Sequence, residues 1–192
     1  MHKRLPLLGR LVEAFEKQLP NKTDSQHNRN MVYETHRYAY GNIELVICSD
    51  SGILTIGSKR NILSDMARGE YRAFFDDDDL PSDCYIEEVM KGVGSGADCC
   101  SLIGQITTNG VNPKIFRHFL SCEKYDEING EYVRYPNHLN CIKSSIAKQF
   151  EFPSMNHGED TEWATQLHWA GALKTEHPIE KIIYFYLFKP IK

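Results

Sequence analysis

The sequence contains no long hydrophobic run and no block of basic residues. Its longest apolar stretch, "IIYFYLF" at residues 182–188, is far shorter than the roughly 20 apolar residues of a membrane-spanning helix, and the N-terminus lacks the apolar core of a signal peptide. The formal net charge of −4 and the scattered lysines and arginines give no sign of a nucleic-acid-binding surface. We therefore expect a cytoplasmic globular protein without nucleic-acid or transmembrane association.

Paired cysteine spacings are absent as well. The six cysteines show neither the regular spacing of a disulfide scaffold nor the C-x-x-C pattern that is typical of zinc sites. We expect them to be reduced thiols that are mostly buried. A zinc site that uses Cys122, His118 or His138 is a minor alternative.

Alternating strand and helix patterns fill most of the chain, whose 192 residues suit one domain. We predict helices at residues 5–19, 142–150 and 160–170, one from Ser58 to Gly69, and one capped by Ser82 or Asp83 that closes near Gly92. Strands are expected at residues 43–50, 71–75, 98–107 and 181–188, a hairpin around Asn129-Gly130, and a loop at residues 20–30. This order predicts an α/β domain with a mostly parallel central sheet flanked by helices.

Four consecutive aspartates occupy residues 76–79, directly after the strand expected at 71–75. Charge runs are more often solvated loops than sites. Here, however, crowded carboxylates at the end of a buried strand repel one another unless a cation screens them. Ligands of open α/β sheets bind beyond the carboxyl ends of the strands, where Asp50 is also expected. The position therefore favours a divalent-ion site, because Mg²⁺ uses carboxylates together with phosphate oxygens.

Several segments resemble one known family. The segment "IGSKRNILSDMARGEYRAFFDDDDLP" (residues 56–81) resembles the nucleotide-binding half of the family-2 inverting glycosyltransferases of the GT-A fold. "NHGEDTEWATQL" (156–167) is similar to the family's Glu-Asp motif, and "YPNHLNCIKSSIA" (135–147) and "LKTEHPIEKIIYFY" (173–186) are similar to segments of small bacterial and viral members. The similarity runs in order over residues 43–186. The chain begins at a segment that resembles the helix after the family's first strand, so that strand is apparently missing.

The resemblance implies one GT-A-like domain over residues 1–192, with a nucleotide-binding half at 1–80 and an acceptor and catalytic half at 81–192. Its expected activity is metal-assisted inverting transfer of a sugar from a nucleotide-sugar donor to the hydroxyl of a glycan or other acceptor. In the family's pattern, donor nucleotide contacts and ligands of Mn²⁺ or Mg²⁺ fall on one group of residues. These are Asp50, Lys59, Arg60, Asp76 and Asp77 for the donor, and Asp76 and Asp78 for the metal.

The catalytic base of the family matches Asp160, with Glu159 beside it. Taken alone, "GED" is more often an acidic helix start. His138 and Lys143 are candidates for acceptor or diphosphate contacts, although their segment also reads as a helix entry capped by Asn140. Trp163 could stack on a sugar, but one or both tryptophans at this helical spacing are more often core residues.

Two other functions compete with glycosyl transfer. The first is a degenerate, non-catalytic relative that binds nucleotide or glycan, which the missing first strand favours. The second is a metal-dependent nucleotidyltransferase, which also uses paired aspartates. The second is less favoured, because no glycine-rich basic phosphate loop is visible near the N-terminus.

Overall fold

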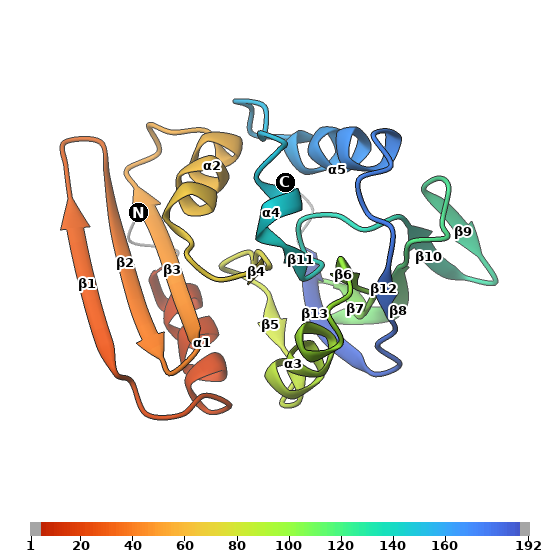
Figure 1. The fold of residues 1–192 in the computed structure, drawn as a ribbon, viewed down its shortest axis with the longest axis horizontal. Coiled ribbons are helices and arrows are strands. Elements are labelled where there is room, and N and C mark those ends of the chain that lie inside the picture. Colours follow the sequence, from red (N-terminus) through yellow and green to blue (C-terminus); the bar gives the residue numbers. More distant parts are fainter. Residues whose placement is uncertain (1–4, 189–192) are drawn as a thin grey trace.

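The computed structural model describes residues 5–188 and contains an α/β arrangement of helices around three sheets (Figure 1). Its helices are α1 (Leu5–Glu16), α2 (Ile56–Met66), α3 (Tyr85–Ser95), α4 (Ser144–Ala147) and α5 (Glu159–Trp169). The helices predicted near 5–19, 58–69, 82–92 and 160–170 are thus confirmed with shifted ends. Among the described residues no helix has both the length and the apolar character to cross a bilayer.

Two of the helix ends differ from the prediction for local reasons. Helix α2 starts earlier because the side chain of Thr55, not Ser58, is the N-cap, and its hydroxyl accepts a hydrogen bond from the Ser58 amide at 3.1 Å. Helix α3 continues through Gly92 and ends at Gly96, whose φ of 72° lies in the left-handed region that suits a glycine C-cap.

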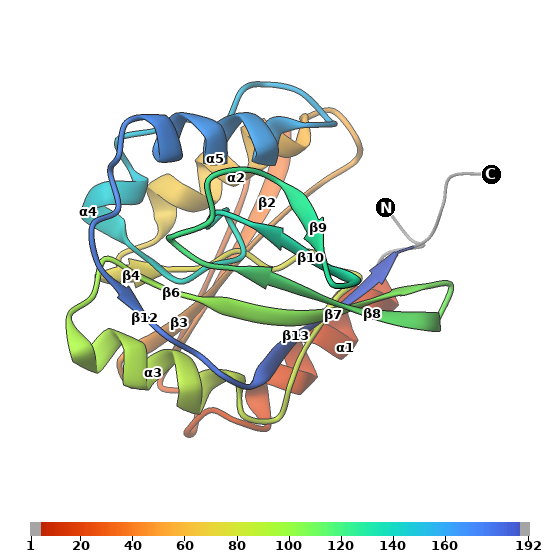
Figure 2. The same cartoon turned by 90° about the vertical axis from the view of Figure 1, so that its right-hand side faces the viewer.

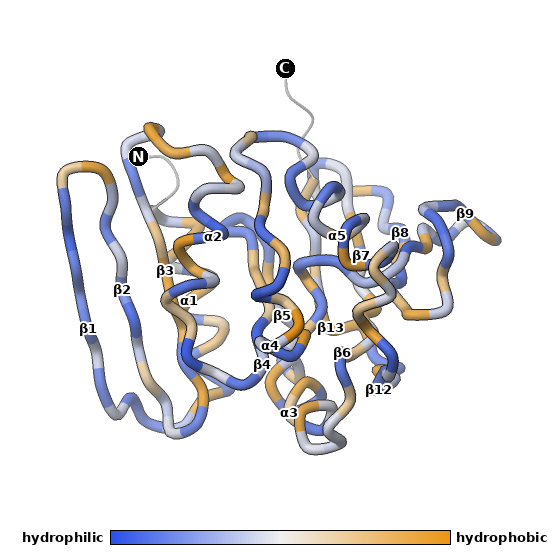
Figure 3. Tube along the Cα trace, turned by 45° about the horizontal axis from the view of Figure 1, so that its top comes forward, coloured by the Kyte–Doolittle hydropathy of each residue, from blue (hydrophilic) through white to orange (hydrophobic). Residues whose placement is uncertain are grey.

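A three-stranded antiparallel sheet forms one side of the molecule, in the order β1-β2-β3. Its strands are β1 (Asp24–Arg29), β2 (Tyr33–Tyr40) and β3 (Ile43–Asp50). The loop predicted at 20–30 is therefore wrong for residues 24–29. All residues of β1 are exposed, and they are polar, as the hydropathy colours show (Figure 3). The strand has no apolar face to bury, so it is held in place by its pairing with β2.

A six-stranded mixed sheet forms the other side, in the order β5-β13-β7-β8-β10-β9 (Figure 2). Only the pairs β13–β7 and β10–β8 are parallel. The strands are β5 (Leu80–Pro81), β7 (Leu102–Thr108), β8 (Val111–His118), β9 (Asp126–Ile128), β10 (Glu131–Arg134) and β13 (Ile182–Phe188). The predicted hairpin is confirmed, because Asn129 and Gly130 have φ of 52° and 80°, as a type I′ turn requires.

A small four-stranded sheet lies between these two, in the order β12-β6-β11-β4. Its strands are β4 (Tyr71–Arg72), β6 (Cys99–Cys100), β11 (Ile142–Lys143) and β12 (Glu176–His177). The helix predicted at 142–150 is shortened to α4 because Ile142 pairs with Arg72 and Cys99 as a strand residue. All three sheets are antiparallel or mixed, so the expected mostly parallel sheet is not found.

Two hydrophobic clusters hold the elements together. One packs α1 and α3 against the six-stranded sheet through Phe15, Tyr85 and Tyr184. The other packs α5 against the segment before it, with Trp163 and Phe152 stacked at 4.9 Å between ring centroids. All six cysteines are free thiols, and Cys99, Cys100, Cys122 and Cys141 are buried, as predicted.

Candidate functional site

Arg60 joins three segments that lie far apart in the sequence. Its guanidinium donates one hydrogen bond to Glu159 Oε1 at 2.6 Å and another to Asp76 Oδ1 at 3.0 Å. Arg60 and Glu159 are buried, with 7% and 4% of their surface exposed. Helix α2, the start of α5 and the acidic run are therefore tied at one point, and three of the predicted site residues meet there.

Contacts along α2 fix this meeting point. The Asn61 side chain donates to the Phe152 carbonyl at 2.8 Å and accepts from the Phe152 amide at 2.9 Å, which fastens α2 to the segment before α5. Gly57 allows the close approach, because a Cβ there would lie 1.9 Å from the Pro153 carbonyl oxygen. Because α2 lies this close to the segment before α5, the Arg60 side chain can reach the carboxylate of Glu159.

A cavity of about 580 Å³ opens next to this ion-pair network. Three carboxylates line it, those of Asp76, Asp79 and Asp160, together with residues 137–139 and residues of the mixed sheet. The polar and aromatic residues from the sheet include Lys114, His118, Tyr132, Arg134 and Tyr186. The cavity thus places a half-buried carboxylate at the start of α5 across from a mixed aromatic and basic wall.

His138 lies at the same cavity beside Asp160. The shortest separation between the two is 3.8 Å, from His138 Nδ1 to Asp160 Oδ2. His138 is 4% exposed and neither ring nitrogen has a hydrogen-bond partner. Burial, reinforced by the charge of Arg60, holds the pKa of His138 well below its usual value, so the imidazole is neutral. Buried polar groups are normally hydrogen-bonded, so both ring nitrogens of His138 are available to a water or ligand group in the cavity.

The acidic run is not a uniformly solvated loop. Asp79 is 2% exposed; its Oδ2 accepts from the Tyr184 hydroxyl at 2.6 Å and its Oδ1 from the Leu187 amide at 2.9 Å. Burial raises the pKa of Asp79 to about 7, although these two hydrogen bonds act in the opposite direction. Asp77 and Asp78 are half-buried between Asp76 and Asp79. The fourth aspartate therefore anchors the run to β13.

Asp50 and Lys59 form a separate pair at the end of β3. Lys59 Nζ lies 3.1 Å from Asp50 Oδ1, and the Leu54 amide donates to Asp50 Oδ2 at 2.7 Å. Burial alone would raise the pKa of Asp50, but the hydrogen bonds from the Leu54 and Ile53 amides and from Lys59, together with the charge of Lys59, lower it overall. Lys59 and Arg60 are neighbours on α2, so this helix carries both of the predicted basic residues. Neither Asp50 nor Lys59 lines the cavity.

The remaining predicted residues lie elsewhere. Lys143 on β11 pairs with Asp98, whose Oδ1 is 3.2 Å from Lys143 Nζ, away from the cavity lining. Trp163 is 2% exposed and donates its indole N–H to the Phe150 carbonyl at 3.0 Å, so it packs as a core residue with no free face for a sugar. Trp169 is the exposed tryptophan, at 78%.

Several cavity residues come from strands that the sequence patterns did not indicate. Lys114 and His118 lie on β8, for which no strand was predicted. His118 Nδ1 lies 3.0 Å from Asn140 Oδ1, and burial lowers the pKa of His118 to about 3. Phe116 and His118 are buried and Arg117 between them is half-buried, but the letters "KIFRH" do not alternate between apolar and polar residues, so the sequence carried no clear strand signal here.

The acidic run suits a divalent cation by the chemistry of its donors. Mg²⁺ and Mn²⁺ prefer oxygen ligands, and Mg²⁺ commonly takes one or two carboxylates with substrate phosphates supplying the rest. Asp76 and Asp78 offer two half-buried carboxylates, and Asp76 lines the cavity. Among residues 5–188, the cluster of three or more donors that converges lies elsewhere, at His27, Glu34 and His36, so neither the run nor Cys122 with His118 and His138 forms a closed three-ligand cage.

Comparison with known proteins gives a likeness at the level of fold. No family model and no curated protein matches the sequence. Two crystal structures of S. aureus TarS, a family-2 glycosyltransferase, are similar to this chain at TM-scores of 0.50 and 0.51. The identities are 17% and 16%, and the matches cover 72% and 73% of this chain but 41% and 25% of the TarS chains. The chain thus shares its fold with part of these TarS structures, and it spans less than half of their length.

Proposed function

We propose that the protein transfers a sugar from a nucleotide-sugar donor to an acceptor hydroxyl by a metal-assisted, inverting displacement. The observation that carries this proposal is the Arg60 bridge, which joins Asp76 of the acidic run to Glu159 of the "GED" motif. Asp76 and Asp160, the residue after Glu159, both line the 580 Å³ cavity. A solvated acidic loop or a plain helix start would have no need of a shared buried cation. The likeness to TarS supports the same class of reaction.

The donor diphosphate fits beside the acidic run. Asp76 and Asp78 would hold Mn²⁺ or Mg²⁺, which supplies charge neutralisation for the departing nucleoside diphosphate. Arg60 fixes the carboxylate of Asp76 through Oδ1. In this proposal Asp50, with Lys59 beside it at the end of β3, would bind the ribose or base, and Asp77 is a second candidate for the ribose.

The two acidic residues of the "GED" motif take different roles in this proposal. Asp160 lines the cavity and lies at the N-terminal end of α5, so its carboxylate accepts the proton of the acceptor hydroxyl as that oxygen attacks the anomeric carbon. Glu159 is buried and bound to Arg60, so it positions the bridge rather than taking the proton. His138, 3.8 Å from Asp160, is placed to orient the same hydroxyl through a ring nitrogen.

The test is a nucleotide-sugar panel assayed for transfer and hydrolysis with Mn²⁺ or Mg²⁺. We expect Asp160→Asn to lower kcat about 10²–10⁴-fold with donor binding intact, as for loss of a general base. Asp78→Asn should weaken metal-dependent donor binding. The matched control is Asp126→Asn. Asp126 lies on β9 and pairs with Lys124, and the variant should behave as the wild type.

Other results would point to the competing functions. Metal-dependent nucleotide binding without turnover in the wild type would identify a binding module. Pyrophosphate release from a nucleoside triphosphate and a sugar phosphate would identify a nucleotidyltransferase. If calorimetry detects no binding of Mn²⁺ or of any donor, or if Asp160→Asn retains full turnover, the proposed function is wrong.

A further inference from the structure

The hairpin formed by β1 and β2 carries a second cluster of metal-ligating side chains, at the edge of the molecule away from the large cavity (Figure 1). His27 on β1 and His36 on β2 are directly opposite each other in the antiparallel register, and Glu34 is two residues from His36 on the same strand. Residues two apart on a strand, and residues paired across strands, project from the same face. All three side chains therefore belong to one face of the hairpin.

Their ligand atoms lie close together. The two imidazole rings stack with centroids 4.3 Å apart and planes 6° from parallel, and His27 Nε2 lies 3.8 Å from Glu34 Oε2. One ligand atom from each residue lies within 4.8 Å of the others. Two nitrogens and one carboxylate oxygen bound to the same zinc ion would be roughly 3.3–3.5 Å apart, given ligand distances near 2.0–2.2 Å. Small rotations of the three side chains, with the strand pairing unchanged, would thus bring the ligand atoms to these distances.

A neighbouring arginine orients one of these ligands. Arg29 Nε holds Glu34 Oε1 at 3.0 Å, while the other oxygen, Oε2, is the one nearest His27. Such a contact orients a carboxylate in the way that outer-shell partners orient metal ligands.

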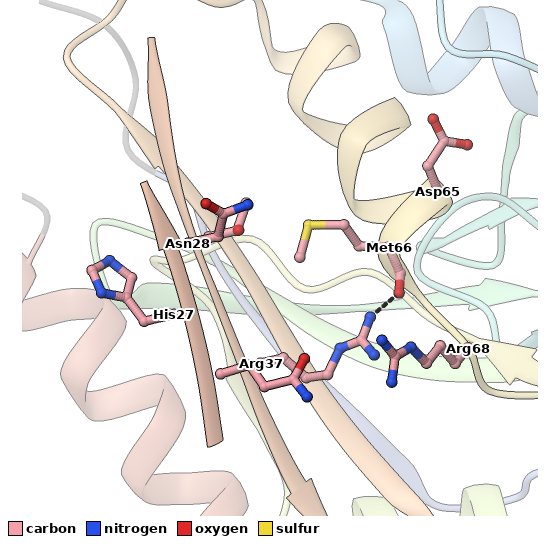
Figure 4. A pocket seen from close by; sticks show the side chains of 8 residues that line it. His27, Asn28, Arg37, Asp65, Met66 and Arg68 are labelled. Atoms are coloured by element: carbon pink, nitrogen blue, oxygen red, sulfur yellow. Dashed lines mark hydrogen bonds between the residues drawn. The ribbon is translucent and has the colours of Figure 1, made fainter. Parts of the chain in front are cut away.

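The opposite face of the same hairpin has a different character. It lines a separate cavity of about 420 Å³, in which the Arg37 guanidinium hydrogen-bonds the Met66 carbonyl at the end of α2 (Figure 4). His27 is also among the residues that line this cavity. In that view the His27 side chain projects away from Arg37, on the other side of the strands. The β2 strand is thus secured to α2 on one face, whereas β1 is exposed along its whole length and pairs with β2 alone.

We propose that His27, Glu34 and His36 bind a zinc ion that clasps β1 to β2. Two imidazoles and one carboxylate form the three-ligand set that zinc accepts with water in the fourth position. The site is independent of the proposed glycosyl transfer, because nitrogen ligands favour Zn²⁺ whereas the carboxylates of the acidic run favour Mg²⁺ or Mn²⁺. Its consequence is structural, since an ion shared by both strands stabilises an edge strand that is exposed and pairs with β2 alone.

The experiment is calorimetric titration of the whole chain with Zn²⁺ in the presence of excess Mg²⁺, which saturates the oxygen-donor site. We expect one zinc per chain, with affinity reduced at least about tenfold by His27→Gln or His36→Gln, as loss of a ligand should cost at least as much as loss of an outer-shell partner. His157→Gln removes an exposed loop imidazole and is the matched control, with unchanged affinity. Zinc at 100 times its Kd should also raise the wild-type Tm by roughly 5–10 °C, and that rise should vanish in His36→Gln.

A second probe separates this site from the cysteines. Substitution by Co²⁺ should give the visible bands of a tetrahedral ion without a sulfur-to-metal charge-transfer band, because both half-buried thiols, Cys48 and Cys84, lie outside the cluster. Absence of zinc binding, equal affinity in the wild type and His36→Gln, or a thiolate band lost on replacing a cysteine would each overturn the proposal. None of these results would bear on the Asp160 experiment.

Discussion

Replacing Arg60 by Met tests whether the bridge between α2, the acidic run and α5 is a buried ion-pair network. The change keeps an unbranched side chain of moderate length but leaves Glu159, which is 4% exposed, without the cation at 2.6 Å. Removing one partner of a buried pair typically costs about 3–5 kcal/mol, because the other charge stays buried. For a chain of this size the loss corresponds to a Tm decrease of roughly 6–20 °C.

The second variant isolates the cause. Arg60→Met combined with Glu159→Gln removes the cation and the buried charge together, so the double variant should be more stable than Arg60→Met by about 1–3 kcal/mol. Such a recovery cannot come from lost packing alone, since the double variant lacks the same guanidinium. Asp76 is more exposed, with 42% of its side-chain surface accessible, and can be rehydrated.

Urea unfolding, followed by circular dichroism and fluorescence, provides the free energies. Arg117→Met is the matched control: Arg117 Nε lies 2.6 Å from Glu131 Oε2, but both side chains are more than one third exposed, so its loss should cost about 0–1 kcal/mol. If Arg60→Met costs no more than Arg117→Met, or if adding Glu159→Gln brings no recovery, the buried network does not hold these segments together.

Three further predictions concern pH, packing and the tryptophans. Because the pKa of His118 is lowered from 6.5 to about 3, the unfolded chain binds a proton there that the folded chain excludes, so stability should fall as pH drops from 6.5 toward 3. In urea titrations, His118→Asn should reduce this slope by up to about 1.4 kcal/mol per pH unit, and unchanged slopes would contradict the assignment. Gly57→Ala should cost about 1–3 kcal/mol by thermal unfolding, because the new methyl group meets the Pro153 carbonyl; a neutral result would mean that α2 can move away freely. Trp163→Ala should cost about 3–5 kcal/mol and Trp169→Ala less than about 0.5 kcal/mol, and equal effects would be inconsistent with the burial of Trp163.

The sequence allowed the helices and the strands with apolar signatures to be predicted, and it indicated the residues that meet at Arg60. It did not allow β1 and β2 to be found, because β1 is polar on both faces and exists through its pairing with β2. Local patterns also could not predict whether strands pair parallel or antiparallel. The apolar run of β3 is typical of a buried parallel strand, yet β3 pairs antiparallel with β2.

The candidate site shows the same division. The carboxylates of residues 76–79, 159 and 160 are conspicuous in the sequence, whereas the basic and aromatic wall opposite them comes from β8 and β10. That wall depends on long-range strand pairing, which spacing within one segment does not encode. Burial likewise assigned Trp163 to the core and Asp79 to an anchoring role, neither of which follows from residue type.

The anchoring of Asp79 has a consequence for how the protein matures during synthesis. Its two partners, the Tyr184 hydroxyl and the Leu187 amide, follow it by 105 and 108 positions. During synthesis, the acidic loop therefore cannot be secured until β13 has been made and has docked beside β7. The loop reaches its final conformation only through contacts between segments more than 100 positions apart, so its closure is a late step of folding.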